Sequence, residues 1–362
     1  MLKTRPWQLL VAALICAAGI IFMIPNFFSR EVLKENYPTW LPTKQVSLGL
    51  DLQGGSHLLL EVELQSLVAE KMERLLGDVR QQLRKEKIRY LKLRSSNDFV
   101  SFKLTNTANL EKLDDVLGEL LTDYEIQSED DGKVIIRFNS NSLSQLRISA
   151  LNQSIEIIRR RIDETGVREP TIQRQGEDRV VVQLPGIDDP ERMKELIGKT
   201  ARLTFHLVDH NVTDEDINSR KIPPGTKLLP IESDNPDNKL PDRMIAVRKK
   251  SELSGDALAD AQPSFQNNQA VVSFRFDTAG GRKFGKITQE NVNRSFAIVL
   301  DGRVISAPNI NEPILGGSGI ISGNFTVRAA NDLALLLRAG ALPAPMKVLE
   351  ERTVGPGLGA DS

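Results

Sequence analysis

Cysteine is almost absent from this chain of 362 residues, in which Cys16 is the only one. A single cysteine excludes intramolecular disulfides and thiolate metal clusters, so packing and hydrogen bonds must stabilise the fold. Histidine occurs three times, and aromatic residues make up only 5% of the chain. The sequence therefore offers few metal ligands and few rings on which bases or sugars could stack.

An excess charge of either sign is also missing. Lysine and arginine number 47 and aspartate and glutamate 48, which gives a net charge of −1. Binding to a nucleic-acid backbone requires a basic field, so we exclude nucleic acid as a partner.

Patterns typical of catalytic centres are lacking as well. The chain has no G-x-S-x-G motif, and His206 and His210 are not followed by the glutamate of the zinc-peptidase pattern. These two histidines flank a predicted strand, which would separate them by about 13 Å at ~3.3 Å per residue. No acid lies in an apolar setting that indicates a raised pKa. We therefore expect no enzyme, no metal site and no cofactor.

Residues 7–28 form the one long apolar run, WQLLVAALICAAGIIFMIPNFF. Its length suffices to cross a bilayer, and Lys3 and Arg5 precede it without any acid. The pattern predicts a transmembrane helix with a cytoplasmic N-terminus and a periplasmic chain from about residue 30 onward. A cleaved signal peptide is the alternative, although the run is long and ends in bulky residues. Lipidation of Cys16 is disfavoured because Ile15 precedes it and the apolar run continues.

Residues 46–63 read VSLGLDLQGGSHLLLEVE. A phosphate-binding loop would need a lysine and a hydroxyl directly after the glycines, opening a helix. Alternating apolar residues instead predict two strands joined by a kink at Gly54 and Gly55.

Beyond this motif, the order helix, two strands, helix, two strands over residues 66–141 predicts a small α+β unit. Ser142 is predicted to cap a long helix that ends at Gly166. Three consecutive arginines, residues 159–161, fan out around that helix, so we expect them to be solvated and ion-paired.

The second half is predicted to alternate strands and helices in the same way. A hairpin over 171–186, a helix over 190–196 and a strand over 201–208 precede a segment, 209–248, whose prolines, asparagines and acids predict a loop. The stretch SGDALADAQ is predicted to form a capped helical turn. Residues 270–276 are predicted to form a strand, and residues 278–291 a helix. Asp301 and Gly302 predict a type I′ hairpin, followed by a leucine-rich helix ending at Gly340 and a strand over 346–354.

LGLDLQGG just beyond a first membrane span resembles the signature of the SecD family, protein-export membrane proteins of the RND superfamily. Three further blocks resemble the same family in the same order, and they cover residues 159–208, 297–323 and 335–362. Residues 66–145 and 209–250 carry little of this resemblance.

The resemblance implies a subunit of the Sec protein-export machinery. In that family, the periplasmic domain binds preproteins emerging from the SecYEG channel and promotes their forward movement, using the proton gradient. It implies SecF, SecYEG, YajC and YidC as partners, together with unfolded preproteins and the bacterial inner membrane. A periplasmic part of an RND-type exporter of small molecules or lipids is the alternative, and a structural scaffold is another.

The family also implies an α+β fold with one N-terminal transmembrane helix, a ferredoxin-like base and an inserted mobile head. By analogy we expect the following divisions: 1–29 N-terminus and transmembrane helix, 30–45 tether, 46–65 base, 66–141 inserted α+β subdomain, 142–208 base, 209–324 head, 325–362 base.

Candidate site residues follow from the same comparison. We expect the motif residues to shape the base: Leu48, Gly49, Leu50, Asp51, Leu52, Gly54 and Gly55. Candidates for contact with preprotein are Phe265, Phe274, Ile310, Ile314 and Leu315, with core packing as the alternative for each. Candidate hinge residues are Gly316, Gly317, Gly319 and Gly323.

SecD proteins continue beyond a VGP-LG-DS segment into further membrane helices, whereas this sequence ends at Ser362 within that segment. We therefore expect the anchor and first periplasmic domain of a longer protein, or the product of a split or truncated gene. Because residues 7–28 hold no carboxylate, histidine or basic group, the chain is not expected to couple to protons by itself.

Overall fold

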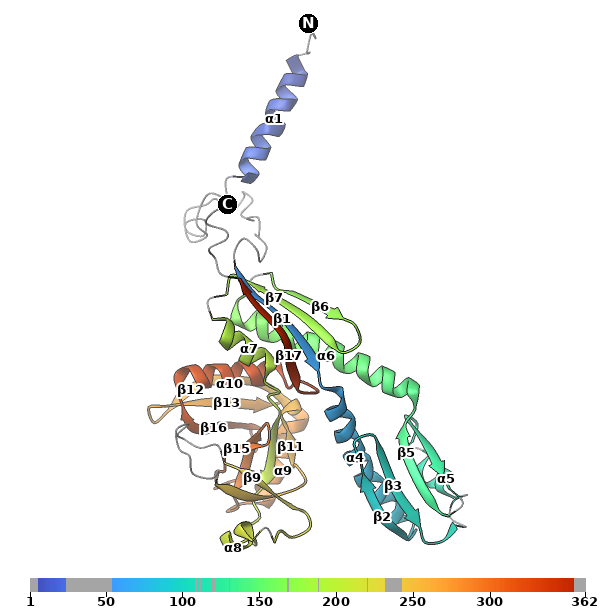
Figure 1. The fold of residues 1–362 in the computed structure, drawn as a ribbon. Helices are drawn as coiled ribbons and strands as arrows, with labels where there is room; N and C mark the ends of the chain where they lie inside the picture. The colour runs from blue at the N-terminus through green and yellow to red at the C-terminus, as the bar shows by residue number, and fades with distance from the viewer. Residues whose placement is uncertain are drawn as a thin grey trace. The chain divides into compact units, whose positions relative to one another are not determined.

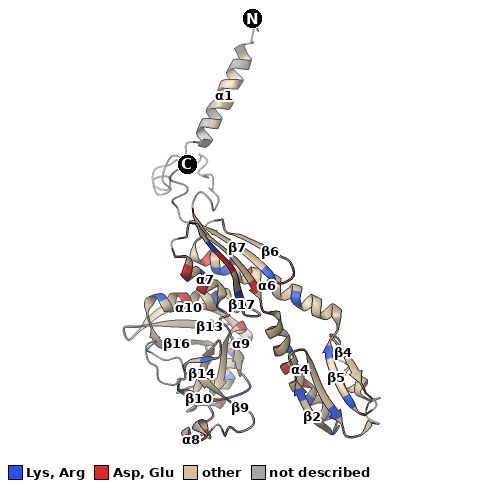
Figure 2. Cartoon of the chain, in the orientation of Figure 1, with Lys and Arg blue, Asp and Glu red and all other residues tan. Residues whose placement is uncertain are grey.

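A computed structural model of the chain describes residues 6–23 and 54–354, except for 108–109, 111, 119–120, 130, 168, 188, 220 and 232–242. Residues 46–53, where the first strand of the double-glycine motif is predicted, lie outside these ranges. Figure 1 shows the described elements, and Figure 2 shows acidic and basic residues interspersed along them.

The chain divides into two compact units, of which the larger is Gly55–Thr353. In the other unit, α1 (Pro6–Met23) is a helix that covers residues 7–23 of the apolar run predicted to be a membrane anchor. Among the described residues, no helix is both long enough and apolar enough to qualify as a membrane span. The membrane anchor therefore remains a prediction.

The first sheet of the larger unit joins the beginning and the end of that unit in the order β17-β1-β7-β6 (Figure 1). Its strands are β1 (Gly55–Val62), β6 (Thr171–Gln175), β7 (Arg179–Pro185) and β17 (Met346–Val354). In β7, Val180, Val182 and Leu184 are fully buried while their neighbours are half-buried, which confirms the predicted period of two.

The helices α6 (Ser140–Thr165) and α7 (Pro190–Gly198) share with this sheet a hydrophobic core that also includes Leu67 and Leu336. The core contains Leu58 and Leu60 from β1, Ile158 and Ile162 from α6, and Leu196 from α7. We call β1, α6, β6, β7, α7 and β17 the base.

The start of α6 differs from the prediction. Asn139, not Ser142, is the N-cap, because the Asn139 side chain accepts a hydrogen bond from the Ser142 backbone N–H at 2.7 Å. The predicted end is confirmed: Gly166 has a φ of 78°, a left-handed conformation that glycine adopts without a steric penalty.

An α+β unit follows β1, as predicted, and has its own core. Its sheet has the order β2-β3-β5-β4. The elements are α4 (Leu64–Lys85), β2 (Tyr90–Ser95), β3 (Phe99–Leu104), α5 (Leu113–Leu117), β4 (Tyr124–Ser128) and β5 (Lys133–Phe138). The buried face of α4 is Leu67, Met72, Leu75, Val79 and Leu83, spaced as a helix requires.

We call residues 203–339 the head. Two of its sheets share one core, with strand orders β11-β8-β14-β15 and β12-β13-β16. Their strands are β8 (Leu203–Leu207), β11 (Leu253–Ser254), β12 (Leu258–Gln266), β13 (Gln269–Phe276), β14 (Phe296–Leu300), β15 (Arg303–Ser306) and β16 (Ser318–Phe325). The helices that join this core are α9 (Thr278–Glu290) and α10 (Val327–Ala339).

Asp301 and Gly302 form the turn between β14 and β15, with φ angles of 47° and 80°. Two successive positive φ angles are those of a type I′ turn, so the predicted hairpin is confirmed.

The expected divisions of the chain do not follow these sheets. β8 pairs with β14 and β11. The expected boundary between base and head, after residue 208, would place β8 in the base and its two partner strands in the head. α10 lies in the segment 325–362 that was expected to belong to the base, and it contributes to both cores: Leu336 to the base core, and Leu333 and Leu337 to the head core.

The segment 209–248 is not simply a loop. It contains α8 (Asp214–Asn218), β9 (Thr226–Pro230) and β10 (Met244–Arg248), and the two strands pair antiparallel. The turn predicted for SGDALADAQ is also shorter than expected. Ser254 caps η3 (Gly255–Ala257), and β12 begins directly afterwards.

Candidate functional site

Gly54 and Gly55 lie where the chain enters β1. Both are buried, and their φ angles are 71° and 142°. L-amino acids with a side chain rarely adopt these angles, so glycine is required for this entry into the sheet. The other motif residues, Leu48, Gly49, Leu50, Asp51 and Leu52, lie outside the described residues.

The head core is built around Phe205 on β8. Its ring packs with those of four other phenylalanines at centroid distances of 5.5 to 6.4 Å: Phe274, Phe276, Phe284 and Phe296. Such a cluster combines a large buried apolar area with favourable ring geometry. The cluster joins β8, β13, β14 and α9 in one core.

Two of the residues expected to contact preprotein belong to this core. Phe274 and Ile310 are each only 4% exposed, so both side chains are buried in the head core. For both residues, the alternative expectation of packing in the core is confirmed. Ile314 is half-buried, and its backbone N–H donates to the hydroxyl of Thr288 at 2.9 Å.

The remaining two candidates are exposed. Phe265 is 67% exposed, at the end of β12 beside the turn to β13, and Leu315 is 74% exposed in the segment before β16. Large apolar side chains with this exposure lose no folding contacts when they bind a partner, and binding removes their surface from water. They are the candidate contact residues that the structure leaves accessible.

A shallow hollow of about 440 Å³ lies on the sheet β12-β13-β16. Its lining residues are Asp260, Gln262, Ser273, Phe274, Arg275, Ser318, Gly319 and Ile320. Five of these residues have polar side chains, but more than half of the surface that lines the hollow is apolar. The hollow therefore suits a mixture of apolar and hydrogen-bonding contacts.

The four glycines expected to form a hinge lie within the head. Gly317 has a φ of 65° and packs against Gly281, and a Cβ on Gly319 would clash with the ring of Phe274. Gly323 packs against the ring of Phe325. These contacts explain three of the glycines by close packing around β16, and none of the four joins the head to the base.

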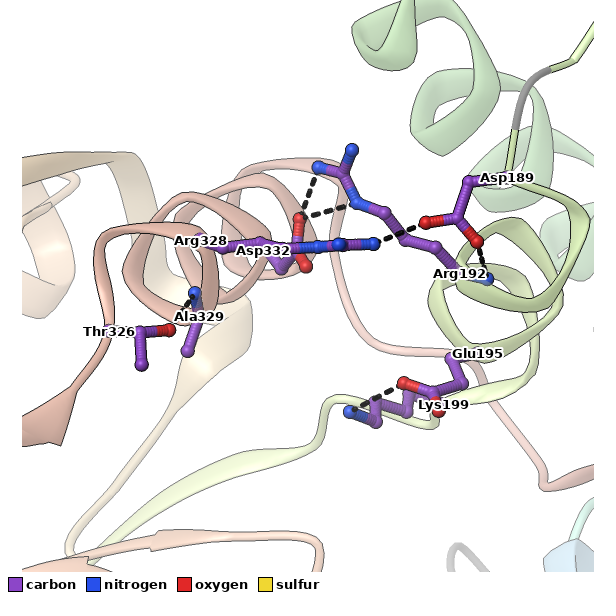
Figure 3. A network of polar contacts seen from close by, with 8 residues as sticks. All are labelled: Asp189, Arg192, Glu195, Lys199, Thr326, Arg328, Ala329 and Asp332. Atoms are coloured by element: carbon purple, nitrogen blue, oxygen red, sulfur yellow. Dashed lines mark hydrogen bonds and ion pairs between the residues drawn. The ribbon is translucent and has the colours of Figure 1, made fainter.

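Ion pairs join α7 of the base to α10. Arg192 donates to one carboxylate oxygen of Asp332 through Nε at 3.2 Å and Nη2 at 2.6 Å, and Arg328 donates to Asp189 (Figure 3). The backbone N–H of Arg192 and the side chain of Arg328 lower the pKa of the Asp189 carboxyl. A third pair joins Arg338 on α10 to Glu164 on α6.

His206 is not arranged as a metal ligand. Its Nδ1 lies 2.9 Å from the carbonyl oxygen of Arg248, and its Nε2 lies 3.2 Å from the Thr204 hydroxyl. Burial lowers its pKa, so the ring is neutral at pH 7. Over the part of the chain that the structure describes, no three His, Cys, Asp or Glu side chains gather as a metal site.

Comparison with curated proteins identifies the family. The chain is 41% identical over 364 residues to the protein translocase subunit SecD of Rickettsia conorii, which covers all of this chain and 68% of that protein. The chain belongs to the SecD family. The SecD of Rickettsia bellii is similarly related, with 42% identity over 359 residues, 98% of this chain and 66% of that protein. The chain thus spans about two thirds of the length of these SecD relatives.

Three family models match in the order expected from the sequence. The SecD/SecF GG motif matches residues 39–63, the N-terminal part of the SecDF P1 domain matches 151–210, and the SecDF P1 head subdomain matches 229–344. A crystal structure of SecDF in its super-membrane-facing form is 27% identical, with a TM-score of 0.51. It covers 88% of this chain, which covers 33% of the SecDF chain.

Sequence reasoning missed one residue of this SecD-family chain. Arg159 and Arg160 are exposed and paired with Glu156, as expected, but Arg161 is completely buried. The signal for it was present in the helical spacing, because residue 161 follows the buried Ile158 by three positions and Ile157 by four. Arg161 therefore lies on the apolar stripe of α6, and the expectation that it is solvated was wrong.

Proposed function

We propose that this chain is the membrane-anchored, periplasmic part of a SecD subunit, and that its head contacts preproteins emerging from the SecYEG channel. The observation that carries the proposal is the match to SecD proteins along almost the whole chain. The exposed side chains of Phe265 and Leu315 supply a surface suited to such contact.

An unfolded preprotein presents apolar side chains and main-chain groups without a fixed sequence. Exposed apolar residues, together with the open hollow of mixed polar and apolar lining on β12, β13 and β16, fit those two features better than one precise pocket would. In this mechanism the head holds an emerging segment, and movement of the head relative to the base keeps that segment from sliding back. No covalent chemistry is involved, so we propose an accessory of transport rather than an enzyme.

The remaining parts of the proposal follow the family. SecF and SecYEG are the proposed partners, with YajC and YidC in the same assembly. Residues 7–28 hold the N-terminus on the cytoplasmic side of the inner membrane, and the base stands on the periplasmic side. Energy comes from the proton gradient through the full-length protein, where one charge moved across 100 mV supplies about 2.3 kcal/mol.

The alternative of a small-molecule or lipid exporter requires a cleft that retains an apolar ligand. The hollow described above is more open than enclosed, so it would leave such a ligand largely exposed to solvent. No observation in the described residues favours that alternative.

Site-specific photocrosslinking in the full-length protein tests the proposed surface. A photoreactive residue is placed at Phe265 or Leu315, and a preprotein is stalled part-way through export. We expect crosslinks from both positions to the stalled chain. Leu91, which is 56% exposed on β2 outside the head, is the matched control and should give little crosslinking.

The result contradicts the proposal if Leu91 labels the stalled chain as efficiently as Phe265 and Leu315, or if neither head position labels it. A folded periplasmic protein should not be labelled from any of the three positions, which excludes collisional crosslinking.

A further inference from the structure

The chain passes between base and head twice. The first crossing, residues 199–202, leads from α7 to β8, and the second crossing, residues 340–345, leads from α10 to β17. The two crossings are bonded to each other, because the backbone N–H of Leu342 donates to the carbonyl oxygen of Thr200 at 2.9 Å. Any change in the orientation of the head relative to the base must act through these two segments.

Arg161 on α6 of the base bonds to both crossings and to the end of α7. Its guanidinium donates to the carbonyl oxygens of Leu196 (2.8 Å), Ile197 (3.1 Å), Lys199, Thr200 (3.3 Å) and Gly340 (3.0 Å). Carbonyls at a helix C-terminus have no donor within the helix and carry the negative end of its dipole. A buried cation is therefore well placed there.

Asp301 holds the first crossing from the head side. Its carboxylate accepts hydrogen bonds from the backbone N–H groups of Ala201 at 3.0 Å and Arg202 at 2.8 Å. Burial lowers the pKa of Arg161 to about 10, and the negative charge of Asp301 opposes this decrease. Arg161 therefore remains a cation at neutral pH, and the first crossing is held between an arginine of the base and an aspartate of the head.

Each crossing contains a residue in an unusual backbone conformation. Ala201 has a φ of 56°, although it carries a side chain, and Gly340 has a φ of 97°. A residue with a side chain adopts a positive φ only where contacts with its surroundings hold the backbone in that conformation. Here the enforcing contacts are the bonds from Arg161 and Asp301.

The other polar contacts described between α10 and the base are easier to separate. They are the ion pairs Arg192–Asp332, Arg328–Asp189 and Arg338–Glu164, all partly exposed. Their charged groups regain water when the pairs separate, so each pair contributes little net stability. The bonds of Arg161 are buried, and breaking them would leave a charge and several carbonyls without partners.

We propose that the two crossings form the hinge between base and head, and that Arg161 is the positioning residue that fixes the orientation of the head. The three ion pairs open first when the head turns, while Arg161 keeps the crossings together. The inference rests on the head movement in the proposed function, and it places the hinge at residues 199–202 and 340–345 rather than at the glycines before and within β16.

Pulsed electron resonance on the whole chain tests this hinge. With Cys16→Ser as background, spin labels at Gln175 on β6 and Lys286 on α9 report the distance between base and head. A second pair, Gln266 and Lys286, reports distances within the head. These label positions are all exposed. We expect Arg161→Lys to broaden the base–head distribution and to leave the head-internal distribution unchanged.

Hydrogen exchange supplies the local readout. In Arg161→Lys the amide of Leu342 should exchange at least ~10-fold faster, because one ammonium group with three N–H donors cannot satisfy the five carbonyls that the guanidinium bonds. Arg160→Ala, the adjacent exposed position, should change neither the distances nor the exchange.

An unchanged base–head distribution in folded Arg161→Lys would overturn the inference, and so would equal broadening of both label pairs. If Arg161→Lys does not fold, Asp301→Asn tests the same crossing from the head side, with the same expected and contradicting results. Because no preprotein is present, failure of the crosslinking experiment leaves this measurement unaffected.

Discussion

Gly319 lies so close to Phe274 that a Cβ on the glycine would sit 2.5 Å from Cζ of the ring. The two residues are directly paired across β13 and β16. The ring of Phe274 also packs against Phe205, Phe276 and Phe284 in the head core, which restricts its movement away from the glycine.

Gly319→Ala should therefore destabilise the head by about 1–3 kcal/mol, the usual cost of overpacking. Urea unfolding of the chain measures this change. Gly316→Ala is the matched control, because the nearest atom to its Cβ would be 3.9 Å away. Equal stability of the two variants would refute the packing role assigned to Gly319.

The turn between β14 and β15 gives a second test, which isolates backbone strain. A Cβ on Gly302 would meet nothing within 4 Å, but its φ is 80°. Gly302→Ala should cost about 1–2 kcal/mol through conformation alone. Gly77→Ala, in the open middle of α4, should stabilise by about 0.5–1 kcal/mol. A neutral Gly302→Ala would show that the turn does not have the conformation described.

The pair Arg192–Asp332 should contribute little free energy despite its short distances. The two side chains are 38% and 22% exposed, so water screens their attraction. A double-mutant cycle with Arg192→Ala and Asp332→Ala, measured by thermal unfolding, should give a coupling below about 1 kcal/mol. A coupling of several kcal/mol would mean that this contact does not open readily.

Acid should weaken the contact between α7 and α10 only at low pH. The pKa of the Asp189 carboxyl is lowered in the folded chain, so its contribution is complete above the ordinary value of 3.8 and is lost as the pH falls through the lowered value. Thermal unfolding should therefore show no contribution from Asp189 to pH dependence between pH 5 and 8. Asp189→Asn should differ in its pH profile only below about pH 4. A difference near pH 6 would contradict this assignment.

The sequence predicted well those elements whose side chains repeat regularly. In β7, buried apolar residues recur at every second position, and in α4 the leucines recur at helical spacing. Each pattern can be recognised within one segment, because it arises from the burial of one face of that element. The turn at Asp301 and Gly302 was predictable for a similar reason, since few residues tolerate two positive φ angles.

What could not be predicted depends on contacts between distant segments. Arg161 is buried because carbonyls 35 to 179 residues away converge on its guanidinium, and composition alone does not reveal that set. Phe265 and Phe274 are both aromatic residues of strands, yet one is exposed and the other is buried by α9 and β8 residues. The hairpin β9–β10 was missed because its two strands of five residues lie in a segment rich in prolines and acids.

The rate of preprotein export by cells carrying the full-length protein tests the central claim most directly. We compare the double variant Phe265→Ser and Leu315→Ser with Leu91→Ser in a pulse-chase experiment, at equal protein levels. The account predicts slower export for the double variant and an unchanged rate for Leu91→Ser. Export at the rate of the unmodified protein by the folded double variant would contradict it.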